Sequence, residues 1–219
     1  MTPLGERRAF AENTGSEGLC AIKLAMGEPR AIHSHAIDDL RFIRDTMARA
    51  GQFSAIPGWG GVTMGATAIL ASAVAGPLAH AERWLAVWSI EAAVAILIAL
   101  VTMVRKARRS SATLLTTPTR RFALVLLPPL AAGAVLTAVF VANGLTARLP
   151  GCWLLLYGVS GATGGALSVR VVPVMGVLFI ALGVAAFIAP SGWGNIFMAA
   201  GFGGLHIIFG AIIARHYGG

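Results

Sequence analysis

Charged residues are scarce in this sequence. Only 12% of its 219 residues are Asp, Glu, Lys or Arg, whereas 57% are hydrophobic. Soluble domains contain about 25% charged residues, so this composition excludes an ordinary soluble protein. The apolar residues fall in blocks of about twenty, the length that an α-helix needs to cross about 30 Å of hydrocarbon. The chain is therefore predicted to be an integral membrane protein.

Cysteines and catalytic motifs are also scarce. The two cysteines, Cys20 and Cys152, fall on opposite sides of the membrane in the topology derived below, so they cannot pair within one chain. No cysteine spacing typical of a metal site occurs, and neither does a P-loop, a zinc-protease motif or a haem attachment site. We therefore expect no metal and no cofactor, and any energy coupling would have to come from a partner.

Six apolar segments predict an all-α bundle of six transmembrane helices within residues 56–214. The fourth segment is short and rich in glycine, and the third contains Pro128 and Pro129. The six segments are 56–78, 84–104, 122–142, 150–167, 171–189 and 193–214. Tryptophans near the segment ends are expected to anchor the helices at the membrane surface: Trp59, Trp84, Trp153 and Trp193.

The residues before the first segment form two regions. Residues 1–31 are polar and lack a sustained period, which predicts a disordered tail; alternatively, translation begins at Met26. They contain no apolar stretch typical of a secretory signal. Residues 32–51 are predicted to form an amphipathic helix, which either lies on the cytoplasmic membrane surface or packs on the bundle as a short cytosolic helix. Its apolar stripe consists of Ile37, Leu40, Ile43 and Met47.

The distribution of basic residues predicts the orientation. The net charge is +8, but the basic residues cluster beside the apolar segments without a basic and aromatic recognition surface, so no nucleic-acid partner is expected. With the N-terminus inside, fifteen basic residues face the cytoplasm and only Arg83 and Arg148 lie outside. This bias predicts that both termini are cytoplasmic. The abundance of Arg, Ala and Gly is typical of a GC-rich bacterial genome, so we expect a bacterial inner membrane, with the lipid bilayer as partner.

Small residues recur at four-residue spacing in the apolar segments. Such pairs let helix backbones approach closely inside a membrane. Close packing is the simpler interpretation, and a glycine-lined path for a solute is the functional alternative. The pairs are Gly61 with Gly65, Gly161 with Gly165, Ala200 with Gly204, and Gly210 with Ala214.

Two ionisable side chains, Glu91 and His206, lie inside the predicted helices. Charged groups are costly in a bilayer, so such residues are candidates for function. Helical rise puts Tyr157 and Glu91 at a similar depth in the outer half, with Thr137 not far off, and His206 nearer the midplane. These residues form either a proton or ligand site, or a protonated Glu91 and a neutral His206 that bond to neighbouring helices.

One short pattern has an enzymatic interpretation. Residues 158–162, Gly-Val-Ser-Gly-Ala, resemble the nucleophile motif of rhomboid intramembrane serine proteases. The resemblance implies that Ser160 is a nucleophile and His206 its base. Six helices with the N-terminus inside also match that family. The short connection between the first two segments, and Phe209 where the family has Gly, depart from its pattern.

A second resemblance extends from about residue 33 to the C-terminus. Residues 39–47, 57–61, 171–176 and 197–206 resemble uncharacterised multi-pass bacterial inner-membrane proteins. That resemblance implies a fold and a location but no activity. We therefore predict a non-enzymatic membrane protein, namely a small-solute transporter, a sensor or an accessory subunit that binds other membrane subunits or further copies of itself. The alternative is a rhomboid-like protease.

Overall fold

A computed structural model of the chain describes residues 37, 39, 40, 42, 56–76, 80–109 and 117–217. Residues 1–50 and residues 51–219 form two separate units. In the first unit, Ile37 and Leu40 of the predicted stripe are helical and exposed. Ile43, Met47 and the predicted tail lie outside the described residues.

The second unit consists of helices. Its helices are α3 (Gly58–Ala75), α4 (Ala81–Arg109), α5 (Thr117–Ala142), α6 (Leu149–Gly165), α7 (Val171–Ile188), α8 (Gly194–Met198) and α9 (His206–His216). A π-helical segment, Ala199–Leu205, joins α8 to α9 without a break. Short 3-10 turns precede α6 and α8, at Thr146–Arg148 and Ser191–Trp193. The described residues contain no strand, which confirms the all-α prediction.

Five helices in the described part of the chain are long and apolar enough to cross a membrane: α3, α4, α5, α7 and the continuous helix from Ser191 to His216. These five helices indicate a multi-pass membrane protein. The helix α6 has 17 residues and is about 25 Å long at helical rise. It is therefore shorter than about 30 Å of hydrocarbon.

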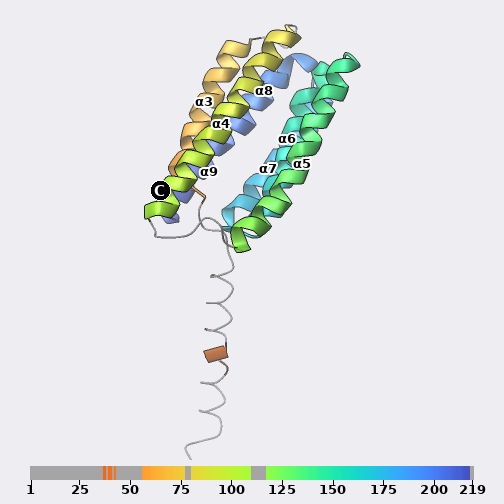
Figure 1. Ribbon diagram of the computed structural model, residues 1–219. Coiled ribbons are helices and arrows are strands. Elements are labelled where there is room, and N and C mark those ends of the chain that lie inside the picture. Colours follow the sequence, from red (N-terminus) through yellow and green to blue (C-terminus); the bar gives the residue numbers. More distant parts are fainter. Residues whose placement is uncertain are drawn as a thin grey trace, which may run out of the picture. The chain divides into compact units, whose positions relative to one another are not determined.

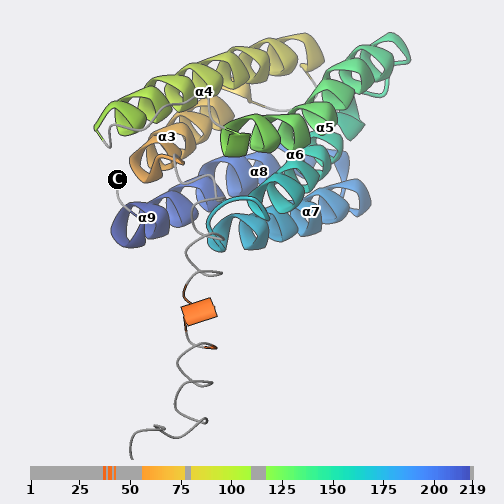
Figure 2. The ribbon, with the colours of Figure 1, turned by 60° about the horizontal axis from the view of Figure 1, so that its bottom comes forward.

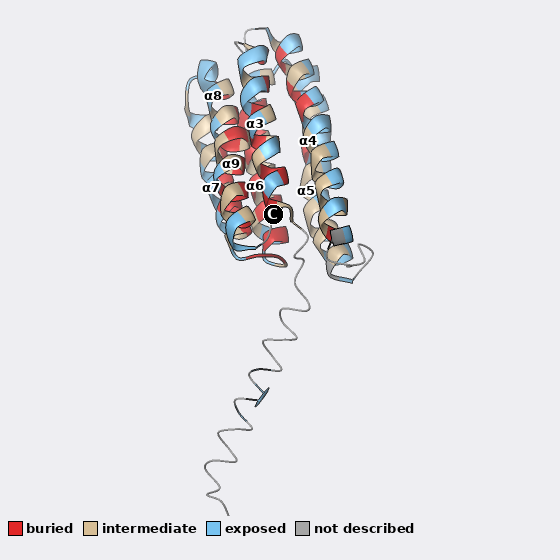
Figure 3. Ribbon diagram, turned by 90° about the vertical axis from the view of Figure 1, so that its left-hand side faces the viewer, coloured by how far each residue is buried: buried red, intermediate tan, exposed pale blue. Residues whose placement is uncertain are grey.

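The helices form two groups of three. In one group α3 packs between α4 and α9, and in the other α6 packs between α5 and α7 (Figures 1 and 2). Contacts of α8 and the π-helical segment with α6 and α7 connect the two groups. In Figure 3 the buried residues gather mainly on α3, α6 and α9, whereas exposed residues run along the outer side of α4. Many of these exposed residues are large and apolar, as a surface against lipid requires.

Glycines set the spacing of the closest helix pairs. A Cβ added to Gly61 of α3 would lie 3.1 Å from the Cα of Gly210 in α9, and one on Gly161 of α6 would lie 3.3 Å from the Cα of Gly176 in α7. The two backbones in each pair therefore touch directly, which confirms close packing for these positions. The predicted pair of Ala200 and Gly204 differs, because a Cβ on Gly204 would meet no atom closer than 4.0 Å.

Two of the four predicted tryptophan anchors do face outward. Trp59 and Trp193 are more than half exposed. Trp84 is fully buried and stacks on Trp153, with ring centroids 5.5 Å apart. The anchor prediction for Trp84 was therefore wrong: its position near a helix end allowed an interfacial place, but its side of α4 faces the bundle.

Lys106 shows which helix ends lie together in this unit. Its Nζ atom donates hydrogen bonds to the backbone oxygens of Ile56 and Tyr217, at 2.9 and 3.2 Å. The start of α3, the end of α4 and the end of α9 therefore meet at one end of the bundle. Arg83 lies at the opposite end of α4, where it donates to the Val74 carbonyl in the last turn of α3 at 2.8 Å.

Candidate functional site

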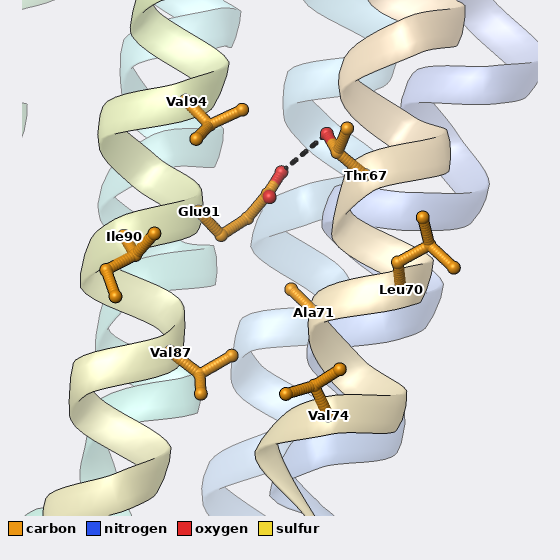
Figure 4. A pocket seen from close by; sticks show the side chains of 8 residues that line it. All are labelled: Thr67, Leu70, Ala71, Val74, Val87, Ile90, Glu91 and Val94. Atoms are coloured by element: carbon orange, nitrogen blue, oxygen red, sulfur yellow. Dashed lines mark hydrogen bonds between the residues drawn. The ribbon is translucent and has the colours of Figure 1, made fainter.

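Glu91 lies in the first half of α4 and points toward α3 (Figure 4). Its side chain is only 9% exposed, and its Oε1 atom is 2.8 Å from the hydroxyl oxygen of Thr67 (Figure 4). The Thr67 hydroxyl is also 2.9 Å from the Met64 carbonyl in its own helix. A threonine hydroxyl has one proton to donate. An ionised Glu91 therefore accepts the hydrogen bond from the Thr67 hydroxyl. A protonated Glu91 instead donates a hydrogen bond to the Thr67 oxygen, and the Thr67 hydroxyl then donates to the Met64 carbonyl.

A groove of about 330 Å³ surrounds this carboxyl group between α3 and α4. Apart from Thr67 and Glu91, its lining is entirely apolar, and Figure 4 shows these side chains on both helices: Leu70, Ala71, Val74, Val87, Ile90 and Val94. Leu70 and Ile90 are about two-thirds exposed, at 66% and 65%. The groove therefore opens sideways, where a membrane protein meets hydrocarbon, and its volume is at the lower end of the range for small-molecule sites.

His206 and Tyr157 form a second polar contact, inside the bundle. The Tyr157 hydroxyl is 2.7 Å from Nε2 of His206, so this hydrogen bond connects α6 to α9. His206 is 7% exposed, and its Nδ1 atom has no hydrogen-bond partner. The backbone carbonyls of Phe202 and Gly201 lie close to the ring.

Aromatic rings enclose this pair. Phe179 lies 4.8 Å from the Tyr157 ring and 5.4 Å from the His206 ring, and Phe202 lies 5.1 Å from Tyr157. Trp88 of α4 continues the cluster through Phe202, at 6.3 Å. Aromatic pairs at these separations are attractive beyond the area they bury. The His206–Tyr157 pair therefore occupies a packed aromatic core.

The π-helical segment ends at this pair. Ala199–Leu205 contains three glycines and directly precedes His206. A π-turn places one additional residue in a helix and changes which face the following residues present. Gly201 and Gly203 are buried, and a Cβ on either would overlap a neighbouring side chain. The segment thus lets the helix stay close to α3 and α7 while it turns His206 toward Tyr157.

Ser160 faces another helix. Its hydroxyl is fully buried and donates to the Leu126 carbonyl of α5 at 3.1 Å. Nε2 of His206 is bonded to Tyr157, and the structure contains no hydrogen bond between Ser160 and His206. The nucleophile and base of the protease hypothesis are therefore not paired in this structure.

Sequence analysis missed Asn195, which connects three helices. Its Oδ1 atom accepts hydrogen bonds from the indole N–H groups of Trp84 and Trp88, at 3.3 and 3.1 Å. Its side-chain amide donates to the Ser72 carbonyl of α3 at 2.7 Å. An amide side chain within an apolar segment requires such partners, and that requirement was the signal available in the sequence.

The predicted polar residues therefore divide between two sites. Glu91 lies in the groove, where it bonds to Thr67, and Tyr157 and His206 lie together in the aromatic core. Thr137 belongs to neither site, since it accepts a hydrogen bond from Trp153. Among the residues that the structure describes, no group of His, Cys, Asp and Glu side chains could hold a metal ion.

The chain matches no protein-family model, no curated protein and no solved structure.

Proposed function

We propose that this chain is a non-enzymatic protein of a bacterial inner membrane that takes a small amphiphilic molecule from the bilayer into the groove between α3 and α4. Transport or sensing of that molecule would be its role, with or without other membrane subunits. The observation that supports this proposal is the groove itself: apolar walls open to hydrocarbon, with one buried carboxyl group at Glu91. Small-molecule sites are usually lined by apolar side chains with a small number of polar groups.

The proposed topology has six spans and both termini in the cytoplasm. The helix α6 would be the sixth span despite its length, because α5 and α7 cover it and only Thr163 of its residues is exposed. A helix enclosed by protein does not need the full apolar length that a lipid-facing helix needs. Residues 32–51 would add an amphipathic helix at the cytoplasmic surface.

The two basic residues on the proposed outer side are compatible with this orientation, because local hydrogen bonds account for both. Arg83 and Arg148 each donate to a carbonyl in the last turn of a helix, Val74 in α3 and Phe187 in α7. Cations at helix C-termini are favourable, so both are explained by local structure. The remaining basic residues lie at the other end or in the segments before α3, as the positive-inside rule requires.

The protease alternative receives no comparable support. Ser160 is bonded to the Leu126 carbonyl, and His206 is bonded to Tyr157. A general base must reach the proton it removes, directly or through one water. The geometry of the groove favours binding over hydrolysis.

A photo-crosslinking experiment tests the groove. The probe is a neutral hydrocarbon chain that carries a benzophenone and ends in a tert-butyl group. We expect it to label peptides of α3 and α4, and we expect Val74→Trp to reduce the labelling at least about fivefold, because the larger side chain fills the groove. Val74 is 54% exposed, so the fold should tolerate the change.

The matched control is Val135→Trp, at a site in α5 that is 64% exposed and outside the groove. This variant should leave the labelling unchanged. Equal labelling of α5 and of the α3–α4 pair, or no effect of Val74→Trp, would contradict the proposed function.

A further inference from the structure

Among the described residues, the carboxyl group of Glu91 has no titratable side chain beside it. It is the only titratable side chain among the eight residues that line the groove. The helix packed against it, α3, contains no titratable residue between Gly58 and Ala75. On α4 itself, the nearest charged side chains are Arg83 toward one end and Arg105 toward the other, more than two helical turns away in each direction. His206, in the helix behind α3, is bonded to Tyr157.

The lack of a charged neighbour among the described residues determines which ligand the Glu91 carboxyl group can bind. A single charge in hydrocarbon is costly, so the group stays neutral through a bound proton or through a bound cation. We propose that the groove between α3 and α4 binds a lipophilic monocation, which exchanges with the proton on Glu91. This inference rests on the proposed function, in which the same groove binds a small amphiphile.

The exchange is balanced in charge. A protonated Glu91 and an arriving cation become an ionised Glu91 paired with the cation, and one proton leaves to water. The site has no net charge before or after the exchange. Thr67 accommodates both states: its hydroxyl accepts a hydrogen bond from the protonated acid and donates to Met64, or it donates to the carboxylate.

The position of Glu91 disfavours a phospholipid headgroup as the cation. Glu91 is seven residues beyond Trp84, where the apolar segment begins, which corresponds to about 10 Å at helical rise. That depth is about a third of the hydrocarbon thickness, whereas headgroups stay at the surface. The ligand must therefore bring its charged atom into the hydrocarbon. Alkyl groups around that atom lower the cost of removing it from water.

The walls define the rest of the ligand. The six remaining lining side chains offer no hydrogen-bonding group, and Thr67 is engaged with Glu91 and Met64. A ligand body with further polar groups would leave them unpaired in an apolar site. The structure thus favours one delocalised or alkylated positive charge on a small hydrocarbon body that fits about 330 Å³.

The test uses two probes of equal shape, with the full chain in lipid nanodiscs. One probe ends in a trimethylammonium group, and the other, neutral probe ends in tert-butyl, as in the crosslinking experiment. Calorimetry in buffers of different ionisation enthalpy measures the protons released on binding. We expect about one proton released per bound cation, and an affinity for the cation that rises about tenfold per pH unit while the free carboxyl group is protonated.

The Glu91→Gln variant isolates the charge. It should bind the cationic probe more than about a hundredfold more weakly, since an unpaired buried charge is left behind, and bind the neutral probe as the parent protein does. Retained binding of the neutral probe also shows that the variant is folded. Glu82→Gln, at an exposed site in the first turn of α4, should change neither affinity.

The outcomes separate the two proposals. Equal affinity for both probes without proton release, or an unchanged cation affinity in Glu91→Gln, would overturn the exchange mechanism and leave the groove as a site for neutral amphiphiles. Failure of both probes to bind the parent protein would overturn the proposed function together with this inference.

Discussion

His206 and Tyr157 depend on each other for hydrogen bonding. Nε2 of His206 has the Tyr157 hydroxyl as its partner, and the Nδ1 atom of the same ring has none. Rings of Phe179 and Phe202 surround the pair. A buried polar group without a partner costs more free energy than a formed hydrogen bond contributes. Loss of the hydroxyl should therefore affect the whole bundle.

We expect Tyr157→Phe to lower the free energy of unfolding by about 1–3 kcal/mol, because Nε2 of His206 would then be buried without a partner. Thermal unfolding in detergent, followed by tryptophan fluorescence, measures the change. Tyr217→Phe at the exposed end of α9 is the matched control and should have almost no effect. Equal stability of the two variants would mean that the Tyr157–His206 bond contributes nothing.

Sequence reasoning identified Glu91, His206 and Tyr157 but not their partners. Apolar segments show which polar residues lie inside a membrane, and helical rise gives an approximate depth. Depth grouped Tyr157 with Glu91, whereas the structure pairs Tyr157 with His206 and Glu91 with Thr67. Partners depend on the rotation of each helix about its axis, and hydropathy contains no information on that rotation.

At the scale of the helices, two backbone contacts between glycines hold the closest pairs. Gly176 of α7 lies against the backbone of α6 at Gly158 and Ala162, and Gly210 of α9 lies against the backbone of α3 at Gly58 and Val62. A Cβ added to Gly176 would be 2.7 Å from the Gly158 oxygen, and one added to Gly210 would be 2.8 Å from the Gly58 oxygen. The two groups of helices thus use the same packing device.

Gly176→Ala and Gly210→Ala should each lower the free energy of unfolding by about 1–3 kcal/mol, because the helices must separate to accommodate a methyl group. Gly192→Ala is the control, since a Cβ at that position would meet no atom within 4 Å. The melting temperatures of the three variants in detergent provide the comparison. A similar melting temperature for Gly176→Ala and Gly192→Ala would contradict direct backbone contact.

The sequence predicted the position of the helices better than their length or internal form. Blocks of apolar residues marked α3 to α9. The fourth segment was expected to be short, as α6 is, but the extension of α4 to Arg109 and the π-helical segment Ala199–Leu205 were not predicted. The π-helical segment lies in a glycine-rich stretch, in which hydropathy is similar for a regular helix and a π-turn, so only tertiary packing distinguishes these forms.

At the scale of the whole molecule, the predicted topology depends mainly on the distribution of charge and on hydropathy. Apolar segments determine how many times the chain can cross the bilayer, and basic residues determine its direction. The contacts of Lys106 with Ile56 and Tyr217 bring the start of α3 and the end of α9 to one end of the bundle, as an even number of spans requires. Five helices meet the length of a span, so the proposed even number depends on α6 as a sixth crossing.

Cysteine accessibility on the two sides of α6 tests the six-span account most directly. In a variant whose two natural cysteines are replaced, Ala147→Cys lies just before α6 and Arg170→Cys just after it. On intact spheroplasts, a membrane-impermeant maleimide should label Ala147→Cys at once, and Arg170→Cys only after the membrane is permeabilised. Labelling of both positions from the same side would mean that α6 does not cross the membrane, and the six-span topology would be wrong.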